Sequence, residues 1–328
     1  MPIPALLCEP VDNLHKNDYA DPMWTTRKGE IFALAGALGF AFNGIVSKLV
    51  LTNGLSSMRL TQVRCGGAFI ILFAYVFLRY RDKLRATRQE LPWLAAYGLI
   101  GFMAVQALYF VAISRMHVSI GLIIEFTAPV WIVIWLRYVM KKYVPPLMWI
   151  SISMAFSGLI LIAQVWKGQT LDPIGVTAAF IDAFALAIYF LLGEKLTRTR
   201  DSETLSVYGF GFASLGLLIL MPIWNYPVGI FTQSINLQGI LDQYTLPGWV
   251  LIMWIIVMGT IVPYLFVVNG IKLLSASTAS VMGMAEPVLA GVFAWIWIAE
   301  KWNFIQLIGG GIVIVGIIFA DKARSAAH

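Results

Sequence analysis

Long apolar stretches alternate with short polar connections along almost the whole chain. Ten of these stretches are close to 20 residues long, and they cover residues 29–50, 58–78, 91–113, 118–139, 146–165, 172–195, 203–222, 247–271, 276–298 and 303–320. An α-helix of about 20 apolar residues spans the hydrocarbon core of a bilayer. The pattern therefore predicts an all-α integral membrane protein with ten transmembrane helices. The connection 223–246 is longer and polar, but nothing in it indicates a separate domain.

The segment from Gly101 to Gly158 has a counterpart later in the chain. A fixed shift of 158 residues aligns its apolar runs, and it pairs Gly101 with Gly259, Ile113 with Ile271, Ser119 with Ser277, Pro129 with Pro287 and Gly158 with Gly316. An internal repeat of apolar helices is typical of transporters that bind their substrate between the halves. Because five spans per half is an odd number, the second half enters the bilayer from the opposite side. We predict two inverted five-helix repeats, 29–165 and 172–320, between cytoplasmic tails at 1–28 and 321–328.

Composition and charge agree with a membrane location. The chain is 59% hydrophobic and 12% charged, whereas a soluble domain has about 25% charged residues. The net charge is +6, and the basic residues gather in the connections on one side of the predicted spans. The positive-inside rule then places both termini in the cytoplasm. Basic residues that follow one membrane face do not indicate binding to nucleic acid, and residues 1–26 lack the apolar core of a signal peptide.

Several short motifs appear in a characteristic order within this frame. They are Pro129-Val130 in the fourth span, Glu286-Pro287-Val288-Leu289-Ala290 in the ninth, Trp297-Ile298-Ala299-Glu300-Lys301 at its end, and Gly309-Gly310-Gly311 in the tenth. Over residues 29–320 the chain resembles the drug/metabolite transporter superfamily, specifically its ten-helix EamA-type exporters. The resemblance implies a secondary transporter of the inner membrane, with a central cavity lined by spans 1, 3, 4, 6, 8 and 9.

The chain departs from that family pattern at three places. Lys142 stands where the second repeat has Glu300, so the glutamate at that turn is kept in one half only. Glu125 and Asp182 lie mid-span, where mostly apolar or small residues are expected. The connection 223–246 is also longer than usual. These departures concern the substrate rather than the fold.

Four charged residues lie well inside predicted spans, away from the span ends, namely Arg64, Glu125, Asp182 and Glu286. A charge near the bilayer centre costs about 2.5–3.5 kcal/mol on the lowest scales, so such residues normally face a partner or a water-filled cavity. The carboxylates are candidates for binding an amino group or carrying a proton. The structural alternative is a neutral carboxyl hydrogen-bonded between helices. For Arg64 the favoured interpretation is a side chain that reaches toward the membrane interface, and the alternative is a pair with a carboxylate.

Three prolines lie within spans of the predicted cavity. Pro129 clashes with the carbonyl group of Glu125, so the helix is expected to open there. Together with Pro263 and Pro287, it marks candidate kinks for gating. Purely structural kinks give the same sequence pattern.

Other polar and aromatic residues of these helices complete the candidate substrate site. The predicted substrate-binding residues are Asn43, Gln106, Tyr109, Glu125, Trp131, Asp182, Tyr189, Tyr264 and Glu286. Aromatic side chains can hold a planar or cationic cargo, and the alternative for each is lipid contact or helix packing.

The sequence thus predicts a secondary transporter that moves a small polar metabolite by alternating access. An amino acid or a related amine-bearing compound is the favoured cargo, with export as the favoured direction. The alternatives are import of a metabolite or vitamin, a lipid or headgroup flippase, and an intramembrane enzyme. No enzyme, phosphate-loop or metal motif is present, and Cys8 and Cys65 lie too far apart in sequence to indicate a metal cluster. We expect no cofactor, protons and lipids as further partners, and a monomer or weak dimer.

Overall fold

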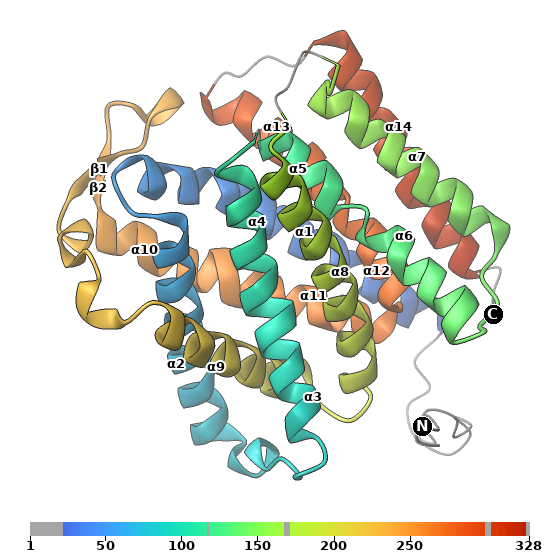
Figure 1. The fold of residues 1–328 in the computed structure, drawn as a ribbon, viewed down its shortest axis with the longest axis horizontal. Coiled ribbons are helices and arrows are strands. Elements are labelled where there is room, and N and C mark those ends of the chain that lie inside the picture. Colours follow the sequence, from blue (N-terminus) through green and yellow to red (C-terminus); the bar gives the residue numbers. More distant parts are fainter. Residues whose placement is uncertain (1–21, 117, 167–170, 299–302, 326–328) are drawn as a thin grey trace.

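Helices that run through apolar sequence make up most of the fold in the computed structural model (Figure 1), which describes residues 22–116, 118–166, 171–298 and 303–325. Within these residues, ten helical segments are long and apolar enough to cross a bilayer. The predicted ten-span, all-α membrane fold is therefore confirmed. Many large apolar side chains on the outer faces of the helices are exposed, such as Ile70, Leu78 and Ile219, as expected where lipid is the solvent.

Six of the ten spans are continuous helices. These are α1 (Pro22–Thr52), α2 (Ser57–Arg79), α7 (Pro146–Ala163), α8 (Pro173–Leu196), α9 (Ser202–Leu220) and α14 (Phe304–Ser325). Asp172 caps α8 and Asp201 caps α9, each by accepting a hydrogen bond from a backbone N–H of the first turn. Because α1 begins at Pro22, it includes part of the predicted tail 1–28, whose residues 1–21 lie outside the described residues.

The other four spans are interrupted. Span 3 consists of α3 (Leu91–Ala96), the π-helix η3 (Tyr97–Ala104) and α4 (Val105–Ile113), and span 4 consists of α5 (Val118–Glu125), α6 (Ala128–Ile134) and the π-helix η4 (Trp135–Val139). Span 8 consists of α10 (Gly248–Ile256), the π-helix η8 (Val257–Ile261) and α11 (Val262–Leu273). Span 9 consists of α12 (Ala276–Gly283) and α13 (Ala285–Ile298). π-Helical segments and breaks of this kind are frequent at functional sites.

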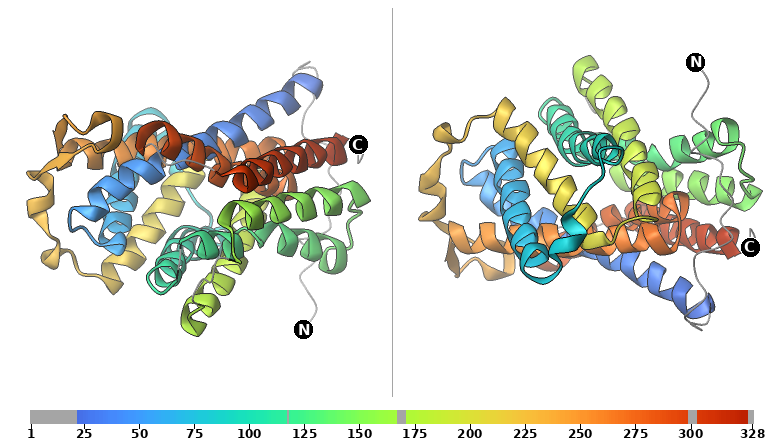
Figure 2. Two further views of the ribbon diagram at one scale, coloured as in Figure 1. Left: turned by 90° about the horizontal axis from the view of Figure 1, so that it is seen from above. Right: turned by 90° about the horizontal axis from the view of Figure 1, so that it is seen from below.

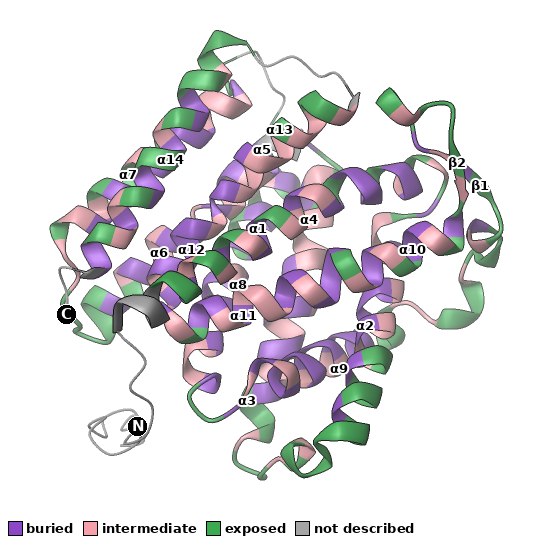
Figure 3. Ribbon diagram, turned by 180° about the vertical axis from the view of Figure 1, so that it is seen from behind, coloured by how far each residue is buried: buried purple, intermediate pink, exposed green. Residues whose placement is uncertain are grey.

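Helices from the two halves of the sequence pack side by side. The closest pairs are α1 with α11, α2 with α9, α4 with α8, and α7 with α14. In each pair one helix comes from residues 29–165 and the other from 172–320. The pair α7–α14 lies at one edge of the molecule in Figures 1 and 2. The halves are therefore interlocked, and their contact surface runs through the middle of the protein, where buried helix faces meet (Figure 3).

The two ends of the bundle differ in structure. One end, which we call the terminal face, carries the start of α1, the end of α14, the short 3₁₀-helix η2 (Arg81–Leu84) and the connections 140–145, 197–201 and 274–275. The opposite end, the loop face, carries the long connection after α9. This connection contains η5 (Ile223–Asn225), η6 (Val228–Phe231), β1 (Ser234–Asn236), η7 (Gly239–Leu241) and β2 (Thr245–Pro247).

The long connection forms a small ordered cap. β1 and β2 pair in antiparallel register, with Ile235 opposite Leu246. Ile235 is fully buried and Ile230 nearly so, because both lie over the start of span 8. Trp297 at the end of span 9 donates a hydrogen bond of 2.9 Å to the carbonyl oxygen of Leu237, which ties the cap to a second span.

Candidate functional site

Glu125 is the last residue of α5, at the point where span 4 is broken. The backbone N–H of Thr127 turns back to the carbonyl oxygen of Ile124, 3.1 Å away, and α6 restarts at Ala128 with Pro129 in its first turn. Proline lacks an N–H and excludes the carbonyl four residues before it. This residue therefore accounts for the break next to Glu125, as the sequence suggested.

Span 9 is broken at the equivalent place. α12 ends at Gly283, and α13 restarts at Ala285, which puts Glu286 and Pro287 in its first turn. The positive end of a helix dipole favours a carboxylate at this position. The breaks at Phe126 and Met284 are 158 residues apart, the same shift that aligns the sequence repeat.

Spans 3 and 8 each contain a π-helical segment. In span 8 this segment, Val257–Ile261, ends two residues before Pro263, and the hydroxyl of Thr260 donates to the carbonyl oxygen of Ile255 at 2.8 Å. A side-chain hydroxyl thus bonds to the backbone of its own helix next to the irregular segment. All three predicted kink prolines therefore lie at helix irregularities, and their gating role stays a prediction.

Asp182 is completely buried in the middle of α8, and neither of its carboxylate oxygens has a hydrogen-bond partner. A buried polar group without a partner is costly, and it normally indicates a functional role or a missing ligand. The side chain lies close enough to Glu125 for their charges to interact.

Glu125 and Glu286 also interact electrostatically, and Tyr109 lies within range of all three carboxylates. Unlike Asp182, both glutamates and Tyr109 keep some accessible surface. The described residues contain no group of three His, Cys, Asp or Glu side chains that could hold a metal ion together. The carboxylates of Glu125, Asp182 and Glu286 are therefore close enough to interact electrostatically but are not grouped as metal ligands are.

Arg64 lies on α2, close enough to Glu286 for their charges to interact. It is 8% exposed, and its Nε donates a hydrogen bond of 3.0 Å to Oγ1 of Thr260. Its charge acts on Glu286 and Tyr264. The favoured sequence interpretation, a side chain that reaches to the interface, was therefore wrong, because Arg64 points into the helix bundle.

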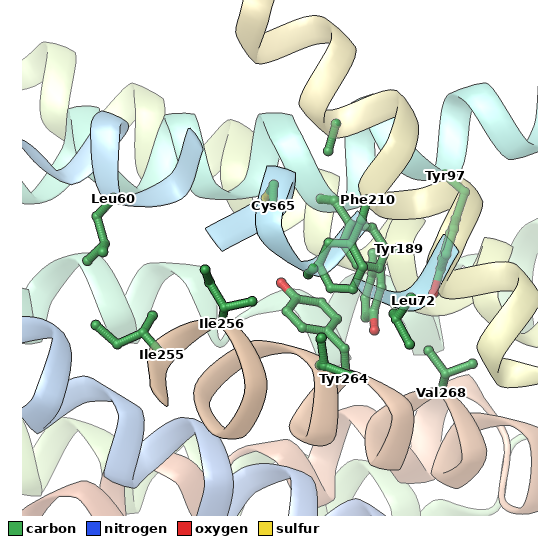
Figure 4. Packing of buried hydrophobic residues seen from close by; sticks show 14 of the residues in the cluster. Leu60, Cys65, Leu72, Tyr97, Tyr189, Phe210, Ile255, Ile256, Tyr264 and Val268 are labelled. Carbon is green, nitrogen blue, oxygen red and sulfur yellow. The ribbon is translucent and has the colours of Figure 1, made fainter. Parts of the chain in front are cut away.

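The remaining candidates separate into two groups. Tyr189 and Tyr264 belong to a packed aromatic cluster with Tyr97, Phe102 and Phe210 between α8, α9 and α11 (Figure 4). Tyr189 is 4% exposed, so a substrate reaches it only if the helices rearrange. Gln106 lies against the hydroxyl of Tyr264 and keeps accessible surface.

Asn43 and Trp131 lie at the margins of the site. Asn43 is buried, accepts a hydrogen bond from Ser47, and fills the space that the missing side chain of Gly259 leaves. Trp131 donates to the hydroxyl of Thr127, and its ring packs 4.4 Å from that of Phe184, a partly exposed residue on the outer face of α8. A direct substrate contact by either residue stays a prediction.

Thr260 was not among the candidates from sequence. A single threonine in an apolar span gives no signal, since its hydroxyl can bond to its own helix backbone. Only the contact with Arg64 identifies it.

The sequence profile of the EamA-like transporter family matches residues 27–164 and 173–320, most of the chain. The chain belongs to the EamA-like transporter family. This membership confirms the resemblance to the drug/metabolite transporter superfamily, and the general function of this EamA-family protein is transport.

Two relatives match the EamA-family chain over nearly their whole length. An uncharacterized transporter of Clostridium kluyveri is 24% identical over 92% of this chain and 96% of its own. The uncharacterized inner membrane transporter YicL of Salmonella typhimurium is 24% identical over 93% of this chain and 100% of its own. A solved crystal structure aligns with a TM-score of 0.72 and 15% identity, covering 92% of this chain and 98% of that one, which shows the fold alone. The EamA-family chain is thus a multi-pass membrane protein.

Proposed function

We propose that the protein is a secondary transporter that moves a small polar metabolite bearing an amino group across the inner membrane, with export as the favoured direction. The observation that carries the proposal is Asp182, a completely buried carboxyl group without any hydrogen-bond partner. Such a group is expensive in the middle of a membrane span and is therefore kept for a function. An amine is the cargo that satisfies it, because an ammonium group supplies both hydrogen-bond donors and the opposite charge.

The neighbouring groups support the same cargo. Glu125 lies near both Asp182 and Glu286, and both glutamates keep accessible surface, so a ligand that enters between the helices meets these carboxylates. The nearest arginine, Arg64, acts on Glu286. In the described residues no Lys or Arg forms a salt bridge with Glu125 or Asp182. This excess of negative charge favours a cationic group over an anionic one. It also permits the carboxylates to bind protons in exchange for the cargo.

Alternating access requires mobile elements near the site, and the broken spans supply them. On the terminal face α12 packs against α6 and α8, and the backbone N–H of Ala276 donates to the carboxylate of Glu194 at 2.8 Å. Both α12 and α13 also pack against α1 and α14, but the main neighbours of α13 do not include α6 or α8. This difference supports a state that is closed on the terminal face, with the halves of spans 4 and 9 moving about the breaks at residues 126 and 284.

A flippase is the alternative that one further observation favours. An apolar cleft of about 300 Å³ opens on the outer side of span 4 and is lined by Ile120, Ile123, Ile124, Ile160, Val165 and Leu171. A lipid tail would fit such a lining. The cleft contains no charged residue, however, and it does not explain the buried carboxylate, so the soluble amine is the better candidate. Import on the same scaffold differs only in direction.

The test is transport in proteoliposomes. A counterflow screen of amino acids, purines and polyamines, with and without a pH gradient, should find an amine-bearing cargo. Glu125→Gln and Asp182→Asn should each lower the rate by at least roughly tenfold, since a charge-assisted contact contributes about 1.5–3 kcal/mol. Asp182→Asn should not lower the melting temperature, because no hydrogen bond of Asp182 is lost.

Asp242→Asn is the matched control, since Asp242 is exposed in the cap on the loop face. It should transport as the wild type does. Unchanged transport in both central variants, or a screen in which only purines or lipids move, contradicts the proposal.

A further inference from the structure

Arg64 is a buried cation whose hydrogen-bonding capacity is only partly used. One nitrogen, Nε, donates to Thr260. The two terminal nitrogens, Nη1 and Nη2, make no hydrogen bond to the described residues, and neither is enclosed without accessible surface. No carboxylate of the described residues lies within salt-bridge distance of Arg64, although the residue as a whole is only 8% exposed. The terminal nitrogens of the guanidinium group therefore keep some accessible surface and remain able to bind a further group.

The orientation of the guanidinium group follows from its neighbours. Thr260 lies in the π-helical segment of span 8 and fixes Nε from one side, while its own hydroxyl proton is used by the carbonyl oxygen of Ile255. The charge of Arg64 acts on Glu286 and on Tyr264, which lies one turn beyond Thr260. Arg64 thus borders the same central region as the carboxylates.

The charges of these groups interact in pairs. Arg64 acts on Glu286, and Glu286 and Asp182 both act on Glu125. The positive group and the unpartnered carboxyl of Asp182 thus belong to one connected set of charges. A small molecule bound among these groups can contact a positive and a negative charge at once.

We propose that Arg64 binds the carboxylate of the cargo, so that the protein transports an amino acid zwitterion in preference to the corresponding amine without a carboxylate. This inference rests on the proposed function, since the amino group of the same cargo would be held at Glu125 and Asp182. The planar guanidinium group offers two parallel N–H donors that match a carboxylate. With Nε held by Thr260, the Nη edge is already oriented for this contact, which lowers the entropy cost of binding.

The competing explanation is that Arg64 only balances the charge of Glu286. In that case its removal disturbs Glu286 and affects every cargo equally, and neutralising Glu286 as well restores transport. A carboxylate contact instead affects only cargo that carries a carboxylate. The two explanations therefore predict different ratios of the transport rates for cargo with and without a carboxylate. The size of the loss for a single cargo does not separate them.

The experiment compares amino acids with their decarboxylated analogues in proteoliposomes. The probes are three pairs with unlike side chains: L-phenylalanine and 2-phenylethylamine, L-leucine and isoamylamine, and L-lysine and cadaverine. In the wild type the acid of at least one pair should have the higher kcat/KM. Arg64→Gln should lower kcat/KM for that acid by about 10- to 100-fold, the effect of losing a charged hydrogen bond, and change that of the amine by less than about threefold.

Three further variants make the test specific. Arg59→Gln removes a positive charge from the same helix near the loop face, where Arg59 bonds to the carbonyl oxygen of Pro222, and it should leave the acid-to-amine ratio unchanged. Thr260→Val keeps the charge of Arg64 but removes its orienting partner, and it should lower the ratio by a smaller factor, even if Arg64→Gln does not fold. Arg64→Gln combined with Glu286→Gln should not restore transport of the acid.

The outcomes separate the two proposals. If Arg64→Gln and Thr260→Val lower acid and amine equally, or if the double variant restores the acid, the role of Arg64 is overturned while the amine transporter stands. If the wild type moves the amines as fast as the acids, the zwitterion preference is likewise overturned. If the wild type moves none of the six probes, both proposals fail.

Discussion

Gly158 and Gly309 face each other across α7 and α14 at backbone contact distance. A Cβ atom added to Gly158 would lie 2.6 Å from the carbonyl oxygen of Gly309, and one added to Gly309 would lie 2.7 Å from the carbonyl oxygen of Gly158. The same two helices also approach closely at Ser151, whose hydroxyl donates to the carbonyl oxygen of Gly316 at 2.8 Å. Small residues let membrane helices approach closely enough for dispersion and hydrogen bonds to hold them together.

Gly309→Ala should therefore separate spans 5 and 10. The added methyl group meets backbone atoms, which cannot move aside as a flexible side chain can, and overpacking of this kind costs about 1–3 kcal/mol. The expected result is a lower melting temperature of the protein in detergent, measured by the unfolding of purified samples.

Gly311→Ala is the control in the same helix, since nothing lies within 4 Å of a Cβ at that position. Alanine favours a helix over glycine by about 1 kcal/mol, so this variant should be as stable as the wild type or slightly more so. Equal melting temperatures for Gly309→Ala and Gly311→Ala would show that α7 and α14 are further apart than described.

The sequence predicted the spans because hydropathy and helix length are local properties. It also located the breaks in spans 4 and 9, since Pro129 and Pro287 impose them on their own helices. The central carboxylates were found for a related reason: a charge in a long apolar run is conspicuous wherever the helix points.

The features that the sequence did not predict depend on contacts between distant segments. The π-helical segment Tyr97–Ala104 contains no proline, and it packs against α8 and α9. Arg64 is directed inward by Thr260, 196 residues further along the chain. The strand pair in the long connection forms over span 8, where Ile230 and Ile235 find a buried surface. A single span contains no information on any of these partners.

The connection between spans 2 and 3 is joined to the connection between spans 6 and 7 by charged groups. Lys83 lies 2.7 Å from Asp201, and Arg200 donates to the carbonyl oxygens of Lys83 and Arg85 and to the carboxylate of Glu90. Burial works to raise the pKa of Asp201, but hydrogen bonds from Lys83 and Thr204 outweigh it and lower that pKa. Asp201 also caps α9. The pair therefore stabilises the terminal face while Asp201 is ionised.

We predict that the protein loses stability as the pH falls toward the lowered pKa of Asp201. A carboxyl whose pKa is lower in the folded than in the unfolded state contributes stability above its unfolded pKa, about 3.9 for Asp, and this contribution is lost on further acidification. The pKa of Lys83 is raised by its hydrogen bond to Asp201, so the same contact weakens again at strongly alkaline pH. Melting temperatures between about pH 3 and pH 7 measure the acid side.

Asp201→Asn should flatten this acid dependence, and it should lower stability at neutral pH by about 1 kcal/mol or less, because asparagine still caps a helix and a partly exposed ion pair contributes little. Asp82→Asn is the control, since Asp82 and its partner Arg85 are almost fully exposed. A slope that stays the same in Asp201→Asn assigns the acid dependence to other groups.

The terminal face and the loop face lie on opposite sides of the membrane. Arg85 is exposed on the terminal face and Asp242 is exposed in the cap of the loop face, so ten spans place them on opposite sides of the bilayer. In a variant without the native cysteines, Arg85→Cys should react with a membrane-impermeant maleimide only after the cells are opened, whereas Asp242→Cys should react in intact cells. The physical reason is the concentration of Lys and Arg in the connections of the terminal face, which favours the cytoplasmic side. Labelling of both cysteines from the same side would contradict the number of spans, and labelling with the sides exchanged would leave the fold intact but reverse the predicted direction of the termini.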